Sequence, residues 1–383
     1  MKQTVDQSKC IVVLGFSVTA LGTLRCLKQL KKEGYTIILA GTDSQIKIAW
    51  YSNIPDKKFL FKEDLVTGLL GIKDMLPSKP MLLLTQDKDA VEISENRERL
   101  EAYYTFLLSD KDVVETLMEK TKFTRYALSN NLPVPNTYFI TDEKELVSLK
   151  TGFNYPVIVK PYLVHATKVF DQNELEILIR KLNPVNYKSL IVQDYIAGDD
   201  DNLFFCFLLF DASGKLVHKM IAQKLRQWPV SYGTTSLAKT TDVPQLENEL
   251  EKFIAPVNLK GFCSIEFKYD KGRDRFFIME PTIGRFNQQI ALTAASGVNF
   301  PDAMVKVLLG QSLEIKKQKN DIYWLYESND FFSYFNSPKK YGYFRILFKP
   351  HINVLHAASD PMPFFQEILT LLKKRLIKLT KNV

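Results

Sequence analysis

The chain has 383 residues, of which 46% are hydrophobic and 25% are charged. This length allows two or three domains with their own cores, and the composition is that of ordinary globular proteins. No apolar run approaches the ~20 residues that a bilayer-spanning helix needs, and the first residues lack the layout of a signal peptide. We therefore expect a cytoplasmic protein.

The cysteines support the same compartment. They are scattered along the chain and form no C-x-x-C pair, so neither a disulfide framework nor a zinc site is indicated. We expect buried thiols at all four positions, Cys10, Cys26, Cys206 and Cys263.

The net charge is +8, from 51 basic and 43 acidic residues. A basic surface suits nucleic acid, anionic lipid or a small polyanion. We find no nucleic-acid-binding motif, and the aromatic residues are not interleaved with a basic stripe. A small polyanionic ligand together with a basic tail accounts for the excess, and the basic residues of this tail are Lys373, Lys374, Arg375, Lys378 and Lys381.

The first 111 residues alternate strand and helix signals. Short buried strands are predicted at 10–15 and 36–41, with a leucine-spaced helix between them, which is the pattern of a βαβ unit in a parallel sheet. Further strands are predicted at 81–85 and 104–108, separated by a charged helix at 92–101. The pair Gly15 and Gly22 lacks the G-x-G-x-x-G spacing, so a dinucleotide-binding oxidoreductase is disfavoured and a tight strand-to-helix turn is expected.

From residue 112 onwards the pattern changes to a mixed helix and antiparallel-sheet domain. Two turn clusters, 211–214 and 270–273, join strands into hairpins. Helices are predicted at 112–131, 173–182 and 245–254. Strands are predicted at 157–160, 190–195, 203–210, 215–222, 261–269 and 275–280.

The last 65 or so residues are rich in aromatic side chains and end in a basic amphipathic helix. Docking of this helix on the protein's own core is the first expectation, and contact with anionic lipid or an acidic partner is the alternative. Its apolar stripe consists of Phe365, Ile368, Leu369, Leu372, Leu376 and Leu379.

A lysine closes an otherwise apolar strand. In the segment 155–161, Lys160 comes directly after the three apolar residues Val157, Ile158 and Val159. Burial of a lysine costs several kcal/mol, about the penalty known for buried ions, unless an anion neutralises it. Lys160 is therefore a candidate for binding a phosphate.

Two glutamates are expected to face each other across the 261–280 hairpin. Side chains alternate along a strand, so Glu266 and Glu280 fall on the same face if the loop is short. A three-residue loop would pair Asp270 with Asp274 and Ser264 with Glu280. Facing carboxylates repel each other unless a cation lies between them, and Mg²⁺ prefers one or two carboxylates plus phosphate oxygens.

These features, in this order, resemble the ATP-grasp superfamily. The resemblance covers roughly four fifths of the chain and is strongest to the carboxylate–amine ligase branch, which includes D-aspartate ligases and relatives of the carbamoyl-phosphate synthase large subunit. It implies an α/β plus α+β fold: a Rossmann-like pre-ATP-grasp domain at 1–111 with a parallel sheet, and a bipartite ATP-grasp domain at 112–315 with mixed and antiparallel sheets. Within the latter, the lid spans about 125–197 and the core about 198–315. Residues 316–383 form a C-terminal extension.

The resemblance also implies ATP and Mg²⁺ as cofactors and assigns site residues. Phosphate contacts fall to Lys120 and Lys160, and Lys168 or His165 could replace missing lid contacts. Adenine and ribose contacts fall to Gln193, Asp194, Tyr195, Ile196, Asp200 and Asp201. The metal ligands would be Glu266, Glu280 and Thr282, and the catalytic residues Arg285, Arg226 and Lys160.

Two departures from the family pattern keep a second function open. The segment 162–168 has no glycine where a glycine-rich phosphate lid is usual, and Thr282 replaces the usual metal-binding Asn. The leading hypothesis is an ATP-dependent ligase that joins a small carboxylate, such as an amino acid, to an amine or a thiol through an acyl phosphate. A non-catalytic nucleotide-binding sensor or scaffold is the alternative, and a homodimer is also left open.

Overall fold

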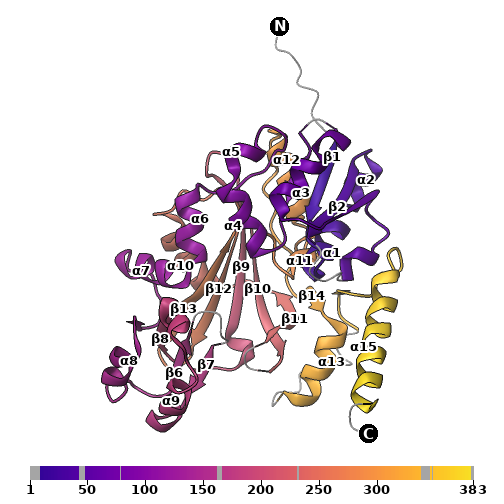
Figure 1. Cartoon of the computed structure of the whole chain (residues 1–383). Helices are drawn as coiled ribbons and strands as arrows, with labels where there is room; N and C mark the ends of the chain where they lie inside the picture. Colours follow the sequence, from indigo (N-terminus) through magenta and orange to yellow (C-terminus); the bar gives the residue numbers. More distant parts are fainter. Residues whose placement is uncertain are drawn as a thin grey trace.

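The computed structural model describes residues 9–42, 48–77, 79–161, 166–230, 233–337, 346 and 348–380, and for 374–380 it describes the backbone alone. Three sheets organise this part of the chain (Figure 1). Their order along the sequence follows the expected α/β region and then the expected α+β region. The four cysteines are free and buried, as predicted.

The first sheet is parallel, with the order β3-β2-β1-β4. Its strands are β1 (Cys10–Leu14), β2 (Thr36–Thr42), β3 (Lys57–Phe61) and β4 (Met81–Leu83). The surrounding helices are α1 (Val18–Cys26), α2 (Lys28–Lys32), α3 (Leu65–Ile72), α4 (Asp87–Glu95) and α5 (Arg97–Leu100). At the end of β1, Gly15 has a φ of 96°, and a Cβ there would lie 2.5 Å from the Gln86 amide nitrogen. The predicted tight turn is confirmed.

The strand predicted at 104–108 is absent. Only a single bridge joins Thr105 to Met81 of β4. The carbonyls of Leu108 and Ser109 accept hydrogen bonds from the Arg97 side chain instead of a neighbouring strand. The segment is thus joined to the sheet through Thr105 alone, which exchanges backbone hydrogen bonds with Pro80 and Leu82.

The helix predicted at 112–131 is two helices, α6 (Lys111–Met118) and α7 (Lys120–Ser129). Glu119 between them is extended, with φ −94° and ψ 123°, and its carboxylate accepts hydrogen bonds from the backbone N–H groups of Thr121 and Lys122. This is N-capping, which ends one helix and starts another. Lys120 is thus the first residue of α7 rather than a mid-helix residue.

The second sheet is a small antiparallel lid with the order β5-β8-β6-β7. Its strands are β5 (Thr137–Ile140), β6 (Val157–Lys160), β7 (Thr167–Val169) and β8 (Leu190–Asp194). A compact core joins one face of the sheet to α8 (Glu143–Leu149) and α9 (Gln172–Ile179).

The third sheet has seven strands in the order β13-β12-β9-β10-β11-β14-β15, and only β14 and β15 are parallel. The strands are β9 (Leu203–Phe210), β10 (Leu216–Trp228), β11 (Thr234–Thr240), β12 (Gly261–Asp270), β13 (Arg275–Ile283), β14 (Tyr323–Leu325) and β15 (His351–Asn353). The helices associated with it are α10 (Pro244–Ile254), α11 (Ile290–Ala295), α12 (Phe300–Leu308), α13 (Glu327–Asn336) and α15 (Met362–Thr380). Two of the strands come from the predicted C-terminal extension, which is therefore part of this sheet.

The large sheet has an apolar core on each face. One core joins Phe207 and Phe262 of the sheet to α1, α11, α12 and the first sheet. The other joins Cys206 and Ile265 to α6, α7 and α10. A sheet packed on both faces is a rigid platform, and the lid stands over one end of it (Figure 1).

Candidate active site

A cleft of about 810 Å³ separates the lid from the large sheet. The lid contributes side chains from β6 and β8, and the large sheet contributes them from β10, β12 and β13. The segment after β13 closes one end. Predicted site residues that line the cleft are Lys160, Gln193, Asp194, Tyr195, Ile196, Glu266, Glu280, Thr282 and Arg285.

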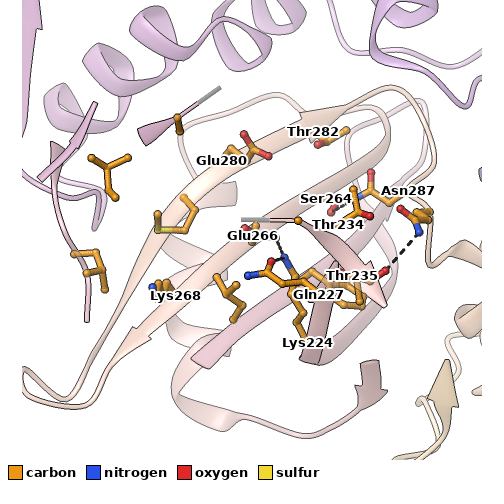
Figure 2. A pocket seen from close by; sticks show the side chains of 18 of the residues that line it. Lys224, Gln227, Thr234, Thr235, Ser264, Glu266, Lys268, Glu280, Thr282 and Asn287 are labelled. Atoms are coloured by element: carbon orange, nitrogen blue, oxygen red, sulfur yellow. Dashed lines mark hydrogen bonds and ion pairs between the residues drawn. The ribbon is translucent and has the colours of Figure 1, made fainter. Parts of the chain in front are cut away.

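Glu266 and Glu280 are direct partners across β12 and β13, so both side chains leave the same face of the sheet (Figure 2). The predicted register was wrong, because Asp270 pairs with Arg275 and Ser264 pairs with Thr282. A four-residue turn and a bulge beside Glu266 shift the pairing by two residues and bring the two carboxylates directly opposite each other. The predicted common face is confirmed, at closer range than expected.

Lys160 lies across the cleft from this pair, on the lid. Burial lowers the pKa of Lys160, and the carboxylates of Glu280 and Glu266 oppose that shift. Glu280 opens onto the cleft but is surrounded by protein, so loss of bulk solvent raises its pKa and Glu266 raises it further. Opposite charges thus face each other across the open cleft, where they attract each other.

A polar chain runs from Glu266 along the floor of the cleft. The Lys224 ammonium lies 3.0 Å from Glu266 Oε2 and donates a longer bond of 3.4 Å to the side-chain Oε1 of Gln227. Gln227 in turn donates to Asp200 Oδ1 at 2.7 Å. Figure 2 shows Lys224 and Gln227 gathered below Glu266. Lys224 therefore supplies the positive charge that holds Glu266 in the structure.

Arg285 is held in place at the end of the cleft by Asp87, Asn287 and the backbone carbonyl of Phe286. Its Nε and Nη2 donate to the two oxygens of Asp87 at 2.8 and 3.0 Å, and Nη1 donates to Asn287 Oδ1 at 2.5 Å. Asn287 donates onward to Ser264 Oγ at 2.8 Å. Because Asp87 opens α4, the arginine links the first sheet to the large sheet at the cleft.

The connector after β8 forms the far wall. Gln193 donates to Thr137 Oγ1 at 2.9 Å, and Asp194 accepts from Asn136 Nδ2 at 2.8 Å. Ile196 is buried, 2% exposed, and gives this wall an apolar surface. An apolar surface bounded by hydrogen-bonded polar groups suits a heteroaromatic ring.

Two lysine side chains make cation–π contacts with the ring of Tyr195, which lies on the same wall. The ammonium groups of Lys168 and Lys268 lie 3.5 and 4.9 Å from its ring centroid. Burial lowers the pKa of Lys268, and the positive charge of Lys168 lowers it further. Two cations over one ring favour an anionic ligand between them.

Arg226 does not reach the cleft, which corrects the prediction that it clamps a substrate. It is fully buried, and its Nε and Nη2 donate to the Asp330 carboxylate of α13 at 2.8 and 2.6 Å. The pairing of β10 with β11 is irregular at Lys224, Arg226 and Gln227. Strict alternation would place Lys224 and Arg226 on one face, and the irregularity separates them so that Lys224 lines the cleft.

Other predicted residues lie outside the cleft lining. Asp200 sits behind Gln227, and burial raises its pKa. The Asp201 carbonyl accepts from Gln223. Lys120 is exposed at the start of α7, near enough for its charge to affect Lys160 and Glu280. His165 lies outside the described residues.

Residues that sequence reasoning did not assign line the cleft as well: Lys224, Gln227, Thr235, Ser264, Lys268, Asn287 and Gln289. Lys268 could have been found, because it lies two residues after Glu266 and therefore on the same face of β12. Asn287 could not, since its position depends on the path of the chain after β13.

The carboxylate pair fits a hard divalent cation. Among the described residues no group of three His, Cys, Asp or Glu side chains could enclose a metal by itself. Mg²⁺ is commonly held by one or two carboxylates together with phosphate oxygens, so Glu266 and Glu280 are a suitable protein contribution. Thr282, which pairs with Ser264 on the same hairpin, lines the cleft beside them.

The three-sheet architecture and this cleft define an ATP-grasp fold, and the sequence resemblance to ATP-grasp carboxylate–amine ligases is confirmed by comparison with known proteins. No protein-family model matches the chain. It is 24% identical over 307 residues to a D-aspartate ligase of Enterococcus faecium, an alignment that covers 73% of this chain and 72% of the ligase. It is 21% identical over 304 residues to the C-terminal section of the carbamoyl phosphate synthase large chain of Methanopyrus kandleri, covering 76% of this chain and 55% of that protein.

Solved structures agree on the fold. An N5-carboxyaminoimidazole synthetase from Staphylococcus aureus superposes with a TM-score of 0.61 at 11% identity, covering 80% of this chain and 78% of that one. A biotin carboxylase from Campylobacter jejuni, in complex with a β-γ-ATP ligand, gives 0.62 at 14% identity, covering 80% and 72%. At these identities the likeness shows the fold alone.

Proposed function

We propose that this protein is an ATP- and Mg²⁺-dependent ligase that activates a carboxylate as an acyl phosphate and joins it to an amine. The observation that carries the proposal is the opposition of Lys160 to the Glu266–Glu280 pair within one cleft. A cation opposite two carboxylates suits the binding of a magnesium-bound polyphosphate. The curated D-aspartate ligase relative supports the same class of reaction.

The nucleotide would lie along the lid side of the cleft. Its adenine would occupy the slot of Gln193, Asp194, Tyr195 and Ile196, and Lys160 would contact the phosphates, with Lys120 and Lys168 nearby. Glu266 and Glu280, with Thr282 beside them, would hold Mg²⁺, which offsets phosphate charge when bound. Neither Asp200 nor Asp201 lines the cleft, so their effect on the ribose would be indirect. Asp200 would act by positioning Gln227, and Asp201 by its place in the adjoining loop.

The proposed chemistry has two steps. A carboxylate oxygen of the substrate attacks the γ-phosphorus in line, and the bond to the ADP oxygen breaks, which gives an acyl phosphate. The amine nitrogen then attacks the acyl carbon, loses a proton, and expels inorganic phosphate. Arg285 lines the cleft where Asp87 and Asn287 hold its guanidinium, and Lys224 lines the cleft beside Glu266. These two cations would orient the acyl phosphate and the incoming carboxylate.

We further propose an amino acid or a related small carboxylate as substrate. The part of the cleft that the nucleotide would leave free is lined by polar side chains, namely Ser264, Thr235, Asn287, Gln288 and Gln289. A thiol in place of the amine is the alternative acceptor. The free, buried thiols support a reducing, cytoplasmic setting.

The second candidate is a non-catalytic nucleotide-binding protein. Thr282 favours it, because a hydroxyl is a poorer metal ligand than an amide carbonyl, and so does the glycine-free segment after β6. In that case ATP would bind without being consumed.

One experiment separates the two candidates. The protein is incubated with ATP, Mg²⁺ and a panel of amino acids in pairs, and ADP, AMP and phosphate are followed. We expect ADP and phosphate that depend on a particular carboxylate and amine, and no such release from Glu280→Gln. ATP binding without turnover across the panel favours the sensor, and AMP release contradicts the acyl-phosphate mechanism.

A further inference from the structure

The C-terminal helix α15 packs on the protein near its start but leaves most of its large apolar side chains exposed. Residues three and four apart share a helix face. Pro363, Gln366, Glu367 and Thr370 share the face that meets the protein, where Pro363 is buried and the other three are half-buried. Glu367 accepts a hydrogen bond from Ser328 of α13 at 3.3 Å. Phe364 also faces inward and packs against the main core, so the inward face combines one aromatic contact with polar side chains.

The opposite face is apolar and exposed. The side chains of Phe365, Ile368, Leu369 and Leu372 are 55%, 38%, 51% and 53% exposed. The first expectation, that this stripe docks on the protein's core, is wrong for these four residues. Leu376 and Leu379 continue the stripe in the sequence, but their side chains lie outside the described part of the chain. Figure 1 shows α15 along the edge of the molecule, beside α13.

The charge of the helix restricts what can cover this face. Glu367 is the last acidic residue of the sequence, and it faces inward; five basic residues follow it. Two copies of such a helix would bring like charges together. One helical stripe is also small compared with the ~800 Å² per partner that a stable protein interface buries. An anionic surface with an apolar interior can bury the apolar stripe and attract the basic residues at the same time.

We propose that α15 is an interfacial membrane anchor, whose apolar face enters the headgroup–acyl boundary of an anionic bilayer while the basic residues contact lipid headgroups. Helices with an apolar face and a lysine-rich flank bind membranes in this way, lying in the interface plane. Each Lys or Arg near an anionic surface adds to the attraction, which salt weakens. Among the described residues no helix is long and apolar enough to cross a membrane, and the proposed mode needs no crossing. The proposal is independent of the proposed ligase activity.

Flotation of the full-length protein with vesicles tests it. The wild type should float with phosphatidylcholine–phosphatidylglycerol vesicles and much less with pure phosphatidylcholine, and added salt should weaken the binding. The Leu369→Gln/Leu372→Gln variant should bind the anionic vesicles at least about tenfold more weakly, because two exposed leucines lose their transfer into lipid. Both positions are exposed, so the variant should melt at the wild-type temperature.

The matched control is Ile177→Gln, which changes an equally exposed apolar residue on α9, 55% exposed, and should bind as the wild type does. Failure of the wild type to float with anionic vesicles at low salt overturns the proposal. So does equal binding by the Leu369→Gln/Leu372→Gln variant. Light scattering that shows a dimer lost in that variant would assign the face to a second copy and also contradict the membrane anchor.

Discussion

At the scale of single residues, Lys160 is the side chain on which nucleotide binding depends most. It is the one predicted phosphate-binding lysine that both lines the cleft and faces the carboxylate pair. Lys160→Ala should weaken ATP binding by about 1.5–3 kcal/mol, the range for hydrogen bonds to charged groups. Isothermal titration measures this loss. The control is Lys144→Ala, an exposed lysine on the lid helix α8, which should leave the affinity unchanged. Wild-type affinity in a folded Lys160→Ala protein would exclude the phosphate contact.

Glu280 tests the metal site. Without ligand, Glu280→Gln removes a repulsion between facing carboxylates, so the melting temperature should stay the same or rise slightly. With Mg–ATP, the variant should lose the stabilisation that a bound ligand gives, which scales as RT ln(1 + [L]/Kd). Thermal melts with and without Mg–ATP measure both effects. A variant that keeps the full ligand-induced shift would show that the pair is not the metal site.

The raised pKa of Glu280 predicts opposite pH dependences for the free and the loaded protein. A carboxyl group whose pKa is higher in the folded state binds its proton more tightly there. The free protein therefore gains stability as the pH falls through the folded-state pKa. Mg–ATP needs the ionised carboxylate, so its affinity should fall over the same interval, at a higher pH than for an ordinary glutamate. Melts across a pH series should show both trends in the wild type and neither in Glu280→Gln; parallel trends in the two proteins would contradict the assignment.

At the scale of elements, the buried pair Arg226–Asp330 fastens α13 to β10 beside the cleft. Both side chains are fully buried. Asp330→Asn should destabilise the protein by about 3–5 kcal/mol, because the fully buried arginine loses the negative charge of the carboxylate that it contacts. The exposed pair Lys239–Asp321 offers the control, and Asp321→Asn should cost less than about 1 kcal/mol. Chemical denaturation measures both, and equal small losses would mean that Asp330 is not needed for the charge balance.

The same elements show how far local pattern predicts structure. Strands with unbroken apolar or alternating residues, such as β9, β12 and β13, were predicted within a few residues, and alternation correctly placed Glu266 and Glu280 on one face. Alternation cannot reveal irregular pairing. In β13 a bulge shifts the register of the hairpin, and in β10 another separates Lys224 from Arg226. Arg226 was therefore expected in the cleft but lies outside it, and Lys224, which lines the cleft, was not predicted.

At the scale of the whole molecule, contacts far apart in sequence unite the two ends of the chain. Arg25 of α1 pairs with Asp360, 335 residues away, at 3.3 Å, and Asp360 also accepts from Ser52 and the Asn53 backbone. The Glu327 carboxylate accepts from the backbone N–H groups of Leu355 and His356. The three-residue strands β14 and β15 carry no periodic signal, so no local pattern could place this region in the large sheet. Together with Arg285 and Asp87, these contacts keep the first sheet and the cleft in a fixed relation.

In the proposed reaction, a carboxylate attacks the γ-phosphate of ATP. Isotope transfer tests this step most directly once a substrate pair is found. With the substrate carboxylate labelled with ¹⁸O, we expect inorganic phosphate that carries one labelled oxygen, because the oxygen that attacked phosphorus leaves with it when the amine displaces phosphate. Label appearing in AMP, or phosphate released without label while product forms, would exclude this mechanism.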